Sequence, residues 1–170
     1  GVPIGSRPYL ATRHATSKIE RLEDIYEGTG LTMGFRGEAL FAMACVSDSL
    51  VVASRTDDDE LATKLVFGKD GKPVNNNNKS SPDGGEILPR KVGTTVAVVK
   101  PFGNLPARRA DLVRRIKQER TRIFKLVESY GIFNVGVCFC LMDMNRNRED
   151  VALVTSASST KIEETASTLL

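Results

Sequence analysis

Three segments in the middle of the chain are rich in β-branched residues and are predicted to form strands of one sheet. They read SLVVASRT at residues 49–56, ATKLVFGKDGK at 62–72 and GTTVAVVK at 93–100. Side chains branched at Cβ favour extended backbone because they pack well on a pleated surface. Helical patterns stand before and after these segments. We therefore expect a fold of the α/β (α+β) class.

Three helices are predicted before the sheet. Ser6 can cap the first, which has Pro8 in its first turn, where a missing N–H costs nothing. The second begins near Ser17 and is closed by Gly28, with apolar residues at helical spacing. The third, GEALFAMACVS at residues 37–47, is apolar nearly all round and is therefore expected to be buried.

A long helix is predicted from Arg109 to about Tyr130, with Gly131 as its stop. Its apolar stripe consists of Leu112, Ile116, Ile123, Leu126, Val127 and Tyr130. The apolar stretch 133–144 is typical of a strand covered on both faces, residues 150–156 make its partner, and residues 159–170 a last helix.

The predicted helices and strands fall into two groups that meet near residues 103–110, so we expect two domains. Residues 1–103 and 104–170 are each predicted to form an α/β sandwich. The polar, low-complexity stretch NNNNKSSPDGGE at residues 75–86 is predicted to be a loop and is given no function.

Composition excludes several classes of protein. The 170 residues are 41% apolar and 26% charged, as in a soluble globular protein. No apolar run approaches the roughly 20 residues that span a bilayer, so no membrane partner is expected. The net charge of +3 does not by itself argue for nucleic acid. Cys138 and Cys140, with a single histidine in the chain, do not predict a metal site. Because the chain begins with Gly1 rather than Met, we expect a fragment.

The first candidate for chemistry is the polar run Thr16, Ser17 and Lys18 at a predicted helix start. Its hydroxyls and ammonium could hold phosphate oxygens, and the helix N-terminal amides add partial positive charge. Taken alone, such a run more often forms a helix cap with a solvated lysine.

The second candidate is MGFRGEAL at residues 33–40, where two glycines stand three apart at the mouth of a helix. Gly34 and Gly37 leave room for close backbone approach, and Glu38 and Ala39 start a helix whose first amides lack partners. This pattern predicts an anion-binding nest. The Glu38 carboxylate would repel a triphosphate unless it faces away, for example toward Arg36, and it could instead cap the helix.

The third candidate is the pair Thr94 and Thr95 at the start of a predicted strand. Their hydroxyls would lie at one end of the sheet. Two β-forming residues after a turn are equally well explained by strand propensity.

These stretches occur in an order that resembles a known family. ATRHATSKI, GFRGEAL, GTTVAVV and FGNLPARR together are similar to the MutL family of DNA mismatch-repair ATPases, and the resemblance covers essentially the whole chain. VVASRTDDD looks most like the eukaryotic Pms-type subunits. The resemblance implies a two-layer sandwich of the gyrase B/Hsp90/histidine kinase/MutL (GHKL) ATPase type. A ribosomal protein S5 domain 2-like α/β domain is expected to begin after it.

The resemblance also implies an ATP site. Thr16, Ser17 and Lys18 would lie in the lid region near the phosphates, and Thr94 or Thr95 would help hold the adenine through water. The loop that wraps the triphosphate by its amides would consist of Gly34, Phe35, Arg36, Gly37, Glu38, Ala39 and Leu40. Residues 104–108 look structural and lead into the second domain.

Several parts of the family's machinery are not expected in this chain. The general base, the magnesium-binding asparagine and the adenine-reading aspartate are expected upstream of Gly1, and a lysine for the γ-phosphate beyond Leu170. The cofactors implied are ATP and Mg, with the Mg ligand absent from this chain. No catalytic residue is assigned, and we expect the chain as given not to hydrolyse ATP while its parent does.

A basic helix adds a tentative DNA site at Arg114, Arg115 and Arg120. Contacts to phosphates would be non-specific and salt-sensitive, although such a charge run is more often a solvated face. The family further implies a MutL-family partner subunit in a heterodimer, a nuclear location and a nucleotide-switched clamp on DNA. The alternative hypothesis is a non-catalytic DNA- or protein-interaction module that keeps only the fold. A topoisomerase subunit is disfavoured by GFRGEAL and NLPAR.

Overall fold

The computed structural model describes residues 1–19, 36–74, 84–145 and 148–154. It divides into two compact units, Gly1–Arg109 and Ala110–Leu170, and the division falls inside helix α3 (Pro106–Arg114). The predicted boundary at residues 103/104 stays a prediction. Among the described residues, no helix combines the length and apolarity needed to cross a bilayer.

The first unit is built on a four-stranded antiparallel sheet with strand order β3-β2-β1-β4. The strands are β1 (Ser49–Arg55), β2 (Ala62–Phe67), β3 (Glu86–Leu88) and β4 (Gly93–Val99). The three predicted strands are confirmed. The short β3 was not predicted, because it consists of only three residues next to a polar stretch.

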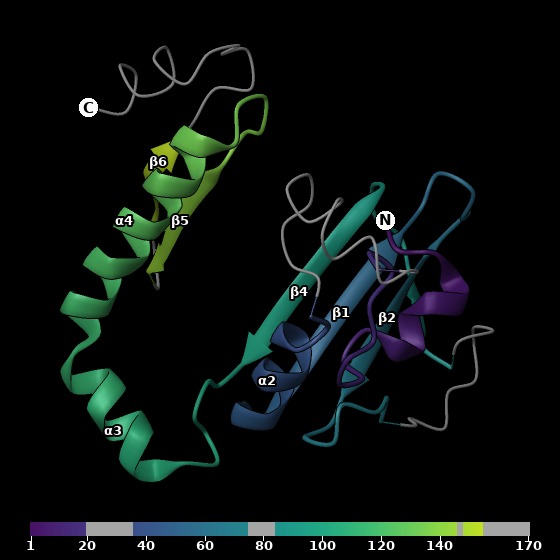
Figure 1. The fold of residues 1–170 in the computed structure, drawn as a ribbon, viewed down its shortest axis with the longest axis horizontal. Coiled ribbons are helices and arrows are strands. Elements are labelled where there is room, and N and C mark those ends of the chain that lie inside the picture. Colours follow the sequence, from purple (N-terminus) through teal and green to yellow (C-terminus); the bar gives the residue numbers. More distant parts are fainter. Residues whose placement is uncertain (20–35, 75–83, 146–147, 155–170) are drawn as a thin grey trace. The chain divides into compact units, whose positions relative to one another are not determined.

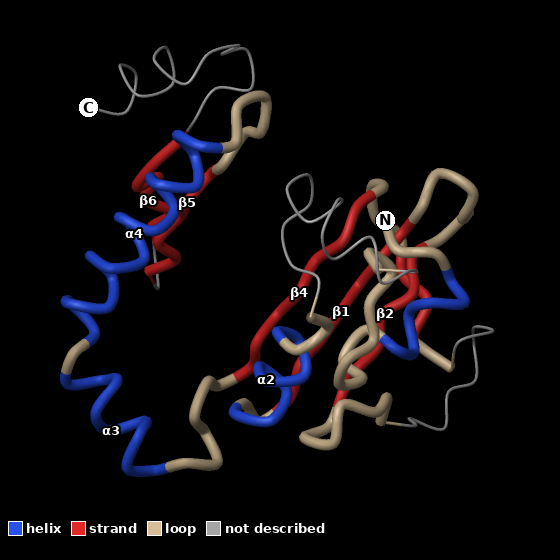
Figure 2. Tube along the Cα trace, viewed as in Figure 1, coloured by secondary structure: helices blue, strands red, loops and turns tan. Residues whose placement is uncertain are grey.

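One face of this sheet carries the core. Alternate residues of β1 are buried, and the buried face continues through Leu65 and Phe67 of β2. The short helix η1 (Ile4–Tyr9) and helix α2 (Ala39–Val46) lie over that face (Figures 1 and 2), and Ala11 and Ala44 complete the cluster. This arrangement of helices on one face of an antiparallel sheet confirms the α/β class.

The first predicted helix is shorter and tighter than expected. Residues 4–9 form a 3-10 helix that follows Pro3, and Ser6 lies inside it rather than capping it. The prediction of a Ser6 cap was wrong. Pro8 lies within the helix and has no N–H to donate, so regular α-helical bonding cannot run through it.

Helix α2 forms where predicted, but the expectation that it is buried was wrong. Ala44 is its only buried residue, and Met43 is 40% exposed. An even apolar composition does not fix burial, because only the side that packs on the sheet is covered.

The C-terminal end of α2 is held by the stretch FGNLPARR. The Phe102 N–H donates to the Val46 carbonyl at 2.6 Å, and the Asn104 side-chain amide donates to the Cys45 carbonyl at 3.2 Å. These bonds satisfy carbonyls that a helix end leaves without partners. The expected structural role of residues 104–108 therefore includes fixing α2.

In the second unit, helix α4 (Ile116–Phe133) accompanies the hairpin β5 (Cys140–Asn145) and β6 (Arg148–Val154). The predicted long helix is broken at Arg115, whose ψ of 11° is not helical. Gly131 is buried inside α4 and does not end it. The strand predicted from residue 133 begins only at Cys140, because α4 runs to Phe133 and Gly136 turns with φ of 81°. The predicted helices at 17–28 and 159–170 lie largely or wholly outside the described residues.

Candidate functional site

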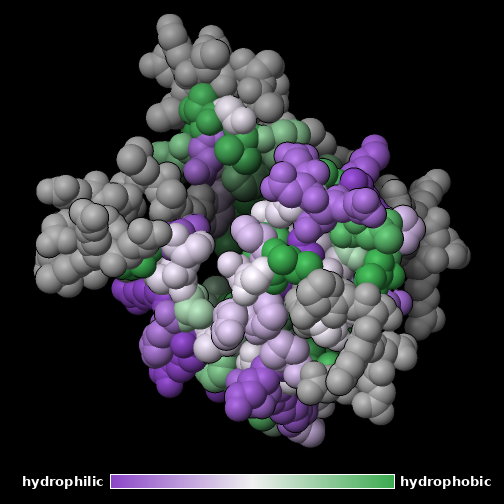
Figure 3. All heavy atoms as spheres, turned by 90° about the vertical axis from the view of Figure 1, so that its right-hand side faces the viewer, coloured by the Kyte–Doolittle hydropathy of each residue, from purple (hydrophilic) through white to green (hydrophobic). Residues whose placement is uncertain are grey.

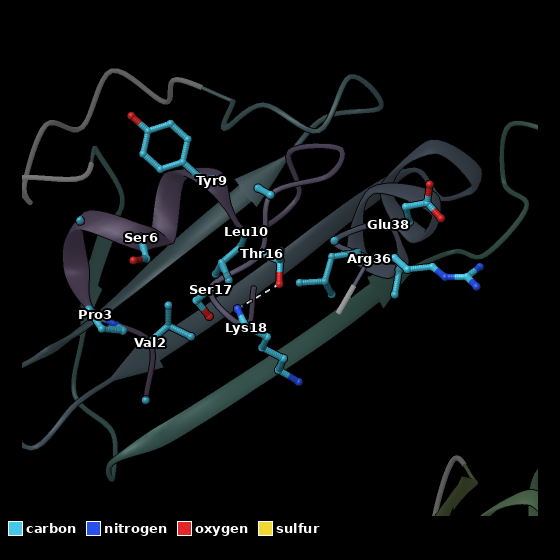
Figure 4. A pocket seen from close by; sticks show the side chains of 16 residues that line it. Val2, Pro3, Ser6, Tyr9, Leu10, Thr16, Ser17, Lys18, Arg36 and Glu38 are labelled. Atoms are coloured by element: carbon cyan, nitrogen blue, oxygen red, sulfur yellow. Dashed lines mark hydrogen bonds between the residues drawn. The ribbon is translucent and has the colours of Figure 1, made fainter. Parts of the chain in front are cut away.

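A cavity of about 1090 Å³ opens in the first unit between the N-terminal segment and the start of α2. Its lining comes from three stretches, within residues 1–10, 15–18 and 36–40. Figure 4 shows Val2, Pro3 and Leu10 from the first stretch and Thr16, Ser17 and Lys18 from the second. The cavity thus has an apolar part beside η1 and a polar part beside residues 15–18 and 36–38.

The polar run predicted from the sequence does line this cavity. The Lys18 N–H donates to the Thr16 hydroxyl at 3.1 Å, which folds the run into a tight local turn. This bond is the short-range side-chain-to-backbone pattern that threonine favours outside helices. Two hydroxyls and an ammonium therefore stand together at the cavity.

Gly37 has a left-handed backbone, as the predicted anion-binding nest requires. Its φ is 62°, and a Cβ there would overlap the Ala15 carbonyl. The chain returns to a right-handed conformation at Glu38, with φ of −110° and ψ of −25°. Such a change of hand turns successive N–H groups toward one concave side, which is the geometry of an anion-binding nest.

Helix α2 begins directly after this turn. Its first internal bond runs from the Ala42 N–H to the Glu38 carbonyl at 2.9 Å. The amides of Ala39 and Leu40 precede that bond and have no acceptor within the helix. Because both residues line the cavity, these amides are available to an anion there.

The Glu38 carboxylate is directed away from the polar run. Its Oε1 lies 3.6 Å from Nδ1 of His14, and Figure 4 shows the side chain pointing away from Thr16 and Lys18. It makes no side-chain cap bond to α2. The carboxylate that was expected to repel a triphosphate is thus turned from the polar part, with His14 rather than Arg36 as the partner that the structure shows.

The side chains of Thr94 and Thr95 in β4 lie on opposite faces of the sheet. Thr94 is paired with Ser54 and Thr95 with Ala53, so their side chains point to opposite faces of the sheet. Thr94 lies on the core face, and its hydroxyl is 2.9 Å from that of Ser54. Neither threonine lines the cavity, but Ser54 accepts a 2.7 Å hydrogen bond from the N–H of Val2, which does. Gly34 and Phe35 lie outside the described residues.

The sequence reasoning missed Arg7, whose side chain is only 1% exposed. Its Nη1 donates to the Thr63 hydroxyl at 3.0 Å, and its Nη2 is paired with Asp59. Hydrogen bonds from the N–H and hydroxyl of Thr56, together with Arg7, lower the pKa of Asp59 to about 2. No local pattern could have found this pair, since arginine is usually exposed and its partner lies 52 positions away.

The tentative DNA residues are all engaged in ion pairs within the chain. Arg114 and Arg115 both approach Asp111, at 2.5 and 3.2 Å, and Arg120 is paired with Asp143. The hydrogen bond from Arg114 lowers the pKa of Asp111. Within the part of the chain that the structure describes, Arg108, Arg109, Lys117 and Lys125 make no ion pair and are exposed.

The described residues do not assemble a metal centre. No group of three or more His, Cys, Asp or Glu among them could hold an ion. The cavity lining contributes a single carboxylate, Glu38, and it faces His14. The described lining therefore does not fit Mg. Hydropathy does not by itself mark the site. Figure 3 shows hydrophilic and hydrophobic side chains interspersed on the face that is turned to the viewer.

Comparison with known proteins gives the context of this cavity. No protein-family model matches the chain. The DNA mismatch repair protein PMS1 of Arabidopsis thaliana is 36% identical over 147 residues, which are 86% of this chain and 15% of that protein. The mismatch repair endonuclease PMS2 of Mus musculus is 32% identical over 151 residues, 88% of this chain and 16% of that protein. The chain therefore spans only a small part of the length of these relatives.

Two solved structures share the fold. The N-terminal domain of a DNA repair protein superposes with a TM-score of 0.72 and 26% identity, covering 98% of this chain and 44% of that one. The Aquifex aeolicus MutL ATPase domain, complexed with ADP, gives a TM-score of 0.58 and 23% identity over 88% of this chain and 53% of that one.

The antiparallel sheet with helices on one face has the α/β sandwich fold that these two structures share. Within this class, the chain belongs to the MutL family of DNA mismatch-repair proteins, and it is of the Pms type.

Proposed function

We propose that this segment forms part of the ATP-binding module of a Pms-type mismatch-repair protein, and that its cavity holds the nucleotide. The observation that carries the proposal is the meeting of Lys18, the Gly37 turn and the first amides of α2, which have no acceptor within the helix, at one cavity. A cationic side chain and converging N–H groups are the combination that recognises a phosphate chain.

The two parts of the cavity suit the two parts of a nucleotide. The amides of residues 37–40, the Lys18 ammonium and the hydroxyls of Thr16 and Ser17 would hold phosphate oxygens. The apolar side chains of Val2 and Leu10 would face the base. The volume of about 1090 Å³ is slightly above the range of about 300–1,000 Å³ that is common for ligand cavities.

Hydrolysis is a proposal for the full-length protein. A general base must lie within hydrogen-bond reach of the attacking water, and the described cavity lining offers only Glu38, which faces His14. We therefore assign no catalytic residue. ATP and Mg remain the proposed cofactors, with any Mg ligand supplied from outside the described residues.

We also propose that the whole protein acts as a nucleotide-switched clamp on DNA in a nuclear heterodimer with another MutL-family subunit. The similarity to PMS1 of a plant and PMS2 of a mouse supports this proposal. Exposed cations that make no ion pair among the described residues are better candidates for contacts to DNA phosphates than Arg114, Arg115 and Arg120, which are paired. In the second unit these are Lys117 and Lys125.

The test of nucleotide binding is titration calorimetry with ADP and a non-hydrolysable ATP analogue on the full-length protein. Lys18→Met should weaken binding about ten- to a hundredfold, the range expected when one charge-assisted hydrogen bond is lost. Lys91→Met removes an exposed lysine away from the cavity and should leave the affinity unchanged. Equal affinities for the unmodified protein and Lys18→Met would contradict the site.

A non-catalytic interaction module is the competing function. It predicts that the unmodified full-length protein binds neither nucleotide at millimolar concentration while still binding DNA or a partner subunit. The same titration separates the two functions.

A further inference from the structure

Arg7 is a buried cation whose contacts join parts of the first unit that lie far apart in sequence. Its Nε donates to the Val2 carbonyl at 2.9 Å, Nη1 donates to Thr63 at 3.0 Å, and Nη2 is paired with Asp59. A charged group at 1% exposure is tolerated only when its donors are satisfied and its charge is paired. The guanidinium therefore has one preferred position, set by Val2, Thr63 and Asp59 together.

Val2 is fixed at both polar groups of its backbone. Its N–H donates to the Ser54 hydroxyl at 2.7 Å, and its carbonyl accepts from Arg7. Because Val2 lines the cavity, these bonds place one wall of the cavity against the sheet. A segment of irregular backbone thereby gains a definite position without belonging to a strand.

The far end of this set of contacts is the turn between β1 and β2. Asp59 Oδ2 accepts from both the N–H and the hydroxyl of Thr56, each at 2.7 Å, besides pairing with Arg7. Asp58, the neighbouring residue, is exposed and makes no hydrogen bond or ion pair within the described part of the chain. Asp59 thus connects the turn at residues 56–59 to Arg7 and, through it, to Val2.

We propose that Arg7 and Asp59 are positioning residues for the nucleotide, coupling the β1–β2 turn to the wall of the cavity. This inference rests on the proposed function, because it takes the ligand to be the nucleotide that the cavity holds. Coupling between two places is reciprocal: if the turn holds the wall in its binding position, a bound nucleotide also stabilises the turn. A pair that serves only folding predicts no such response.

The first experiment compares ADP binding by variants of the full-length protein in titration calorimetry. Asp59→Asn removes the charge that holds Arg7 and should weaken binding about tenfold, whereas the matched control Asp58→Asn should bind as the unmodified protein does. Arg7→Met should weaken binding at least as much, and Arg7→Lys should restore part of the loss. An unchanged affinity in a folded Asp59→Asn protein would overturn the proposal.

The second experiment uses hydrogen exchange on the unmodified protein and does not depend on any variant folding. ADP should slow exchange at the amides of residues 56–61 together with those of residues 2–10. Slowing at residues 2–10 and 37–42 with no change in the turn would overturn the coupling.

The two proposals fail in different ways. If ADP and the ATP analogue bind nowhere on the unmodified protein, the proposed function fails. The anchoring itself is then tested without nucleotide. Asp59→Asn should speed exchange at residues 2–10 relative to Asp58→Asn, and equal exchange in the two variants would overturn the positioning role.

Discussion

The His14 N–H donates a 2.9 Å hydrogen bond to the Gly37 carbonyl, joining the segment that leads to Thr16 with the turn that starts α2. The two residues have positive φ angles of 65° and 62°. A main-chain hydrogen bond therefore connects the two segments that border the polar part of the cavity through residues 15–18 and 36–38. Substitutions at this contact change the site through backbone geometry.

Gly37→Ala is expected to weaken binding of ADP by more than about tenfold. A Cβ at this position would overlap the Ala15 carbonyl, and positive φ costs a non-glycine residue about 1–2 kcal/mol. Gly84→Ala is the control, because Gly84 also has positive φ but a Cβ there meets nothing within 4 Å. Titration calorimetry of both variants checks the expectation. A similar loss in both would show that strain alone is responsible.

Gly71→Ala is expected to destabilise the fold by at least about 1–2 kcal/mol, the cost of its φ of 73° alone. An added Cβ would also overlap the Ala11 carbonyl and crowd Phe41 of α2. Because Ala11 belongs to the core and precedes the polar run, we also expect faster hydrogen exchange at residues 11–18. Chemical denaturation and exchange measure the two effects. A variant as stable as the unmodified protein would contradict the close approach.

Phe67→Ala is expected to lower the free energy of unfolding by about 3–5 kcal/mol, as is usual for a buried phenylalanine. Phe67 is fully buried and belongs to the core cluster on the sheet. Val96→Ala on β4 should cost far less, because Val96 is 42% exposed. Urea denaturation followed by circular dichroism gives both values. Equal costs would mean that the core is not where the structure places it.

Asp59→Asn should lower stability at neutral pH, and the difference from the unmodified protein should disappear on acidification. The hydrogen bonds from Thr56 and the Arg7 charge lower the pKa of Asp59 from 3.8 to about 2, so its ionised form stabilises the folded state. That contribution is complete above pH 3.8 and is lost as the pH falls toward 2. Thermal unfolding between pH 7 and 2 tests the effect, with Asp58→Asn as control. A difference that grows on acidification would contradict the sign.

Removing both Lys117 and Lys125 should weaken DNA binding by the full-length protein more than removing both Arg114 and Arg115. The two arginines are engaged with Asp111, whereas the two lysines make no ion pair among the described residues. The slope of log affinity against log salt concentration should become shallower by about 0.9 for each DNA phosphate that the variant no longer neutralises. Fluorescence anisotropy across a salt series measures it. An unchanged slope in the lysine variant would exclude these residues from the interface.

Local patterns predicted a large part of this fold. The strands of the first sheet and helix α2 follow from residues that are neighbours in the chain, because β-branched side chains and helical periodicity act over a few positions. The same holds for the polar run at Thr16 and the glycine turn at Gly37. What local patterns missed are helix ends, such as the break at Arg115, because capping and packing decide them.

The amino-acid sequence by itself determined the class of the fold, the family and the residues of the polar part of the cavity. Only the tertiary structure decided that Thr94 and Thr95 face opposite ways, that Glu38 is turned toward His14, and that Arg7 is buried against Asp59. These facts depend on contacts between residues far apart in the chain, whose energies no local pattern contains. A buried charge finds its partner only once the sheet has brought the two segments together.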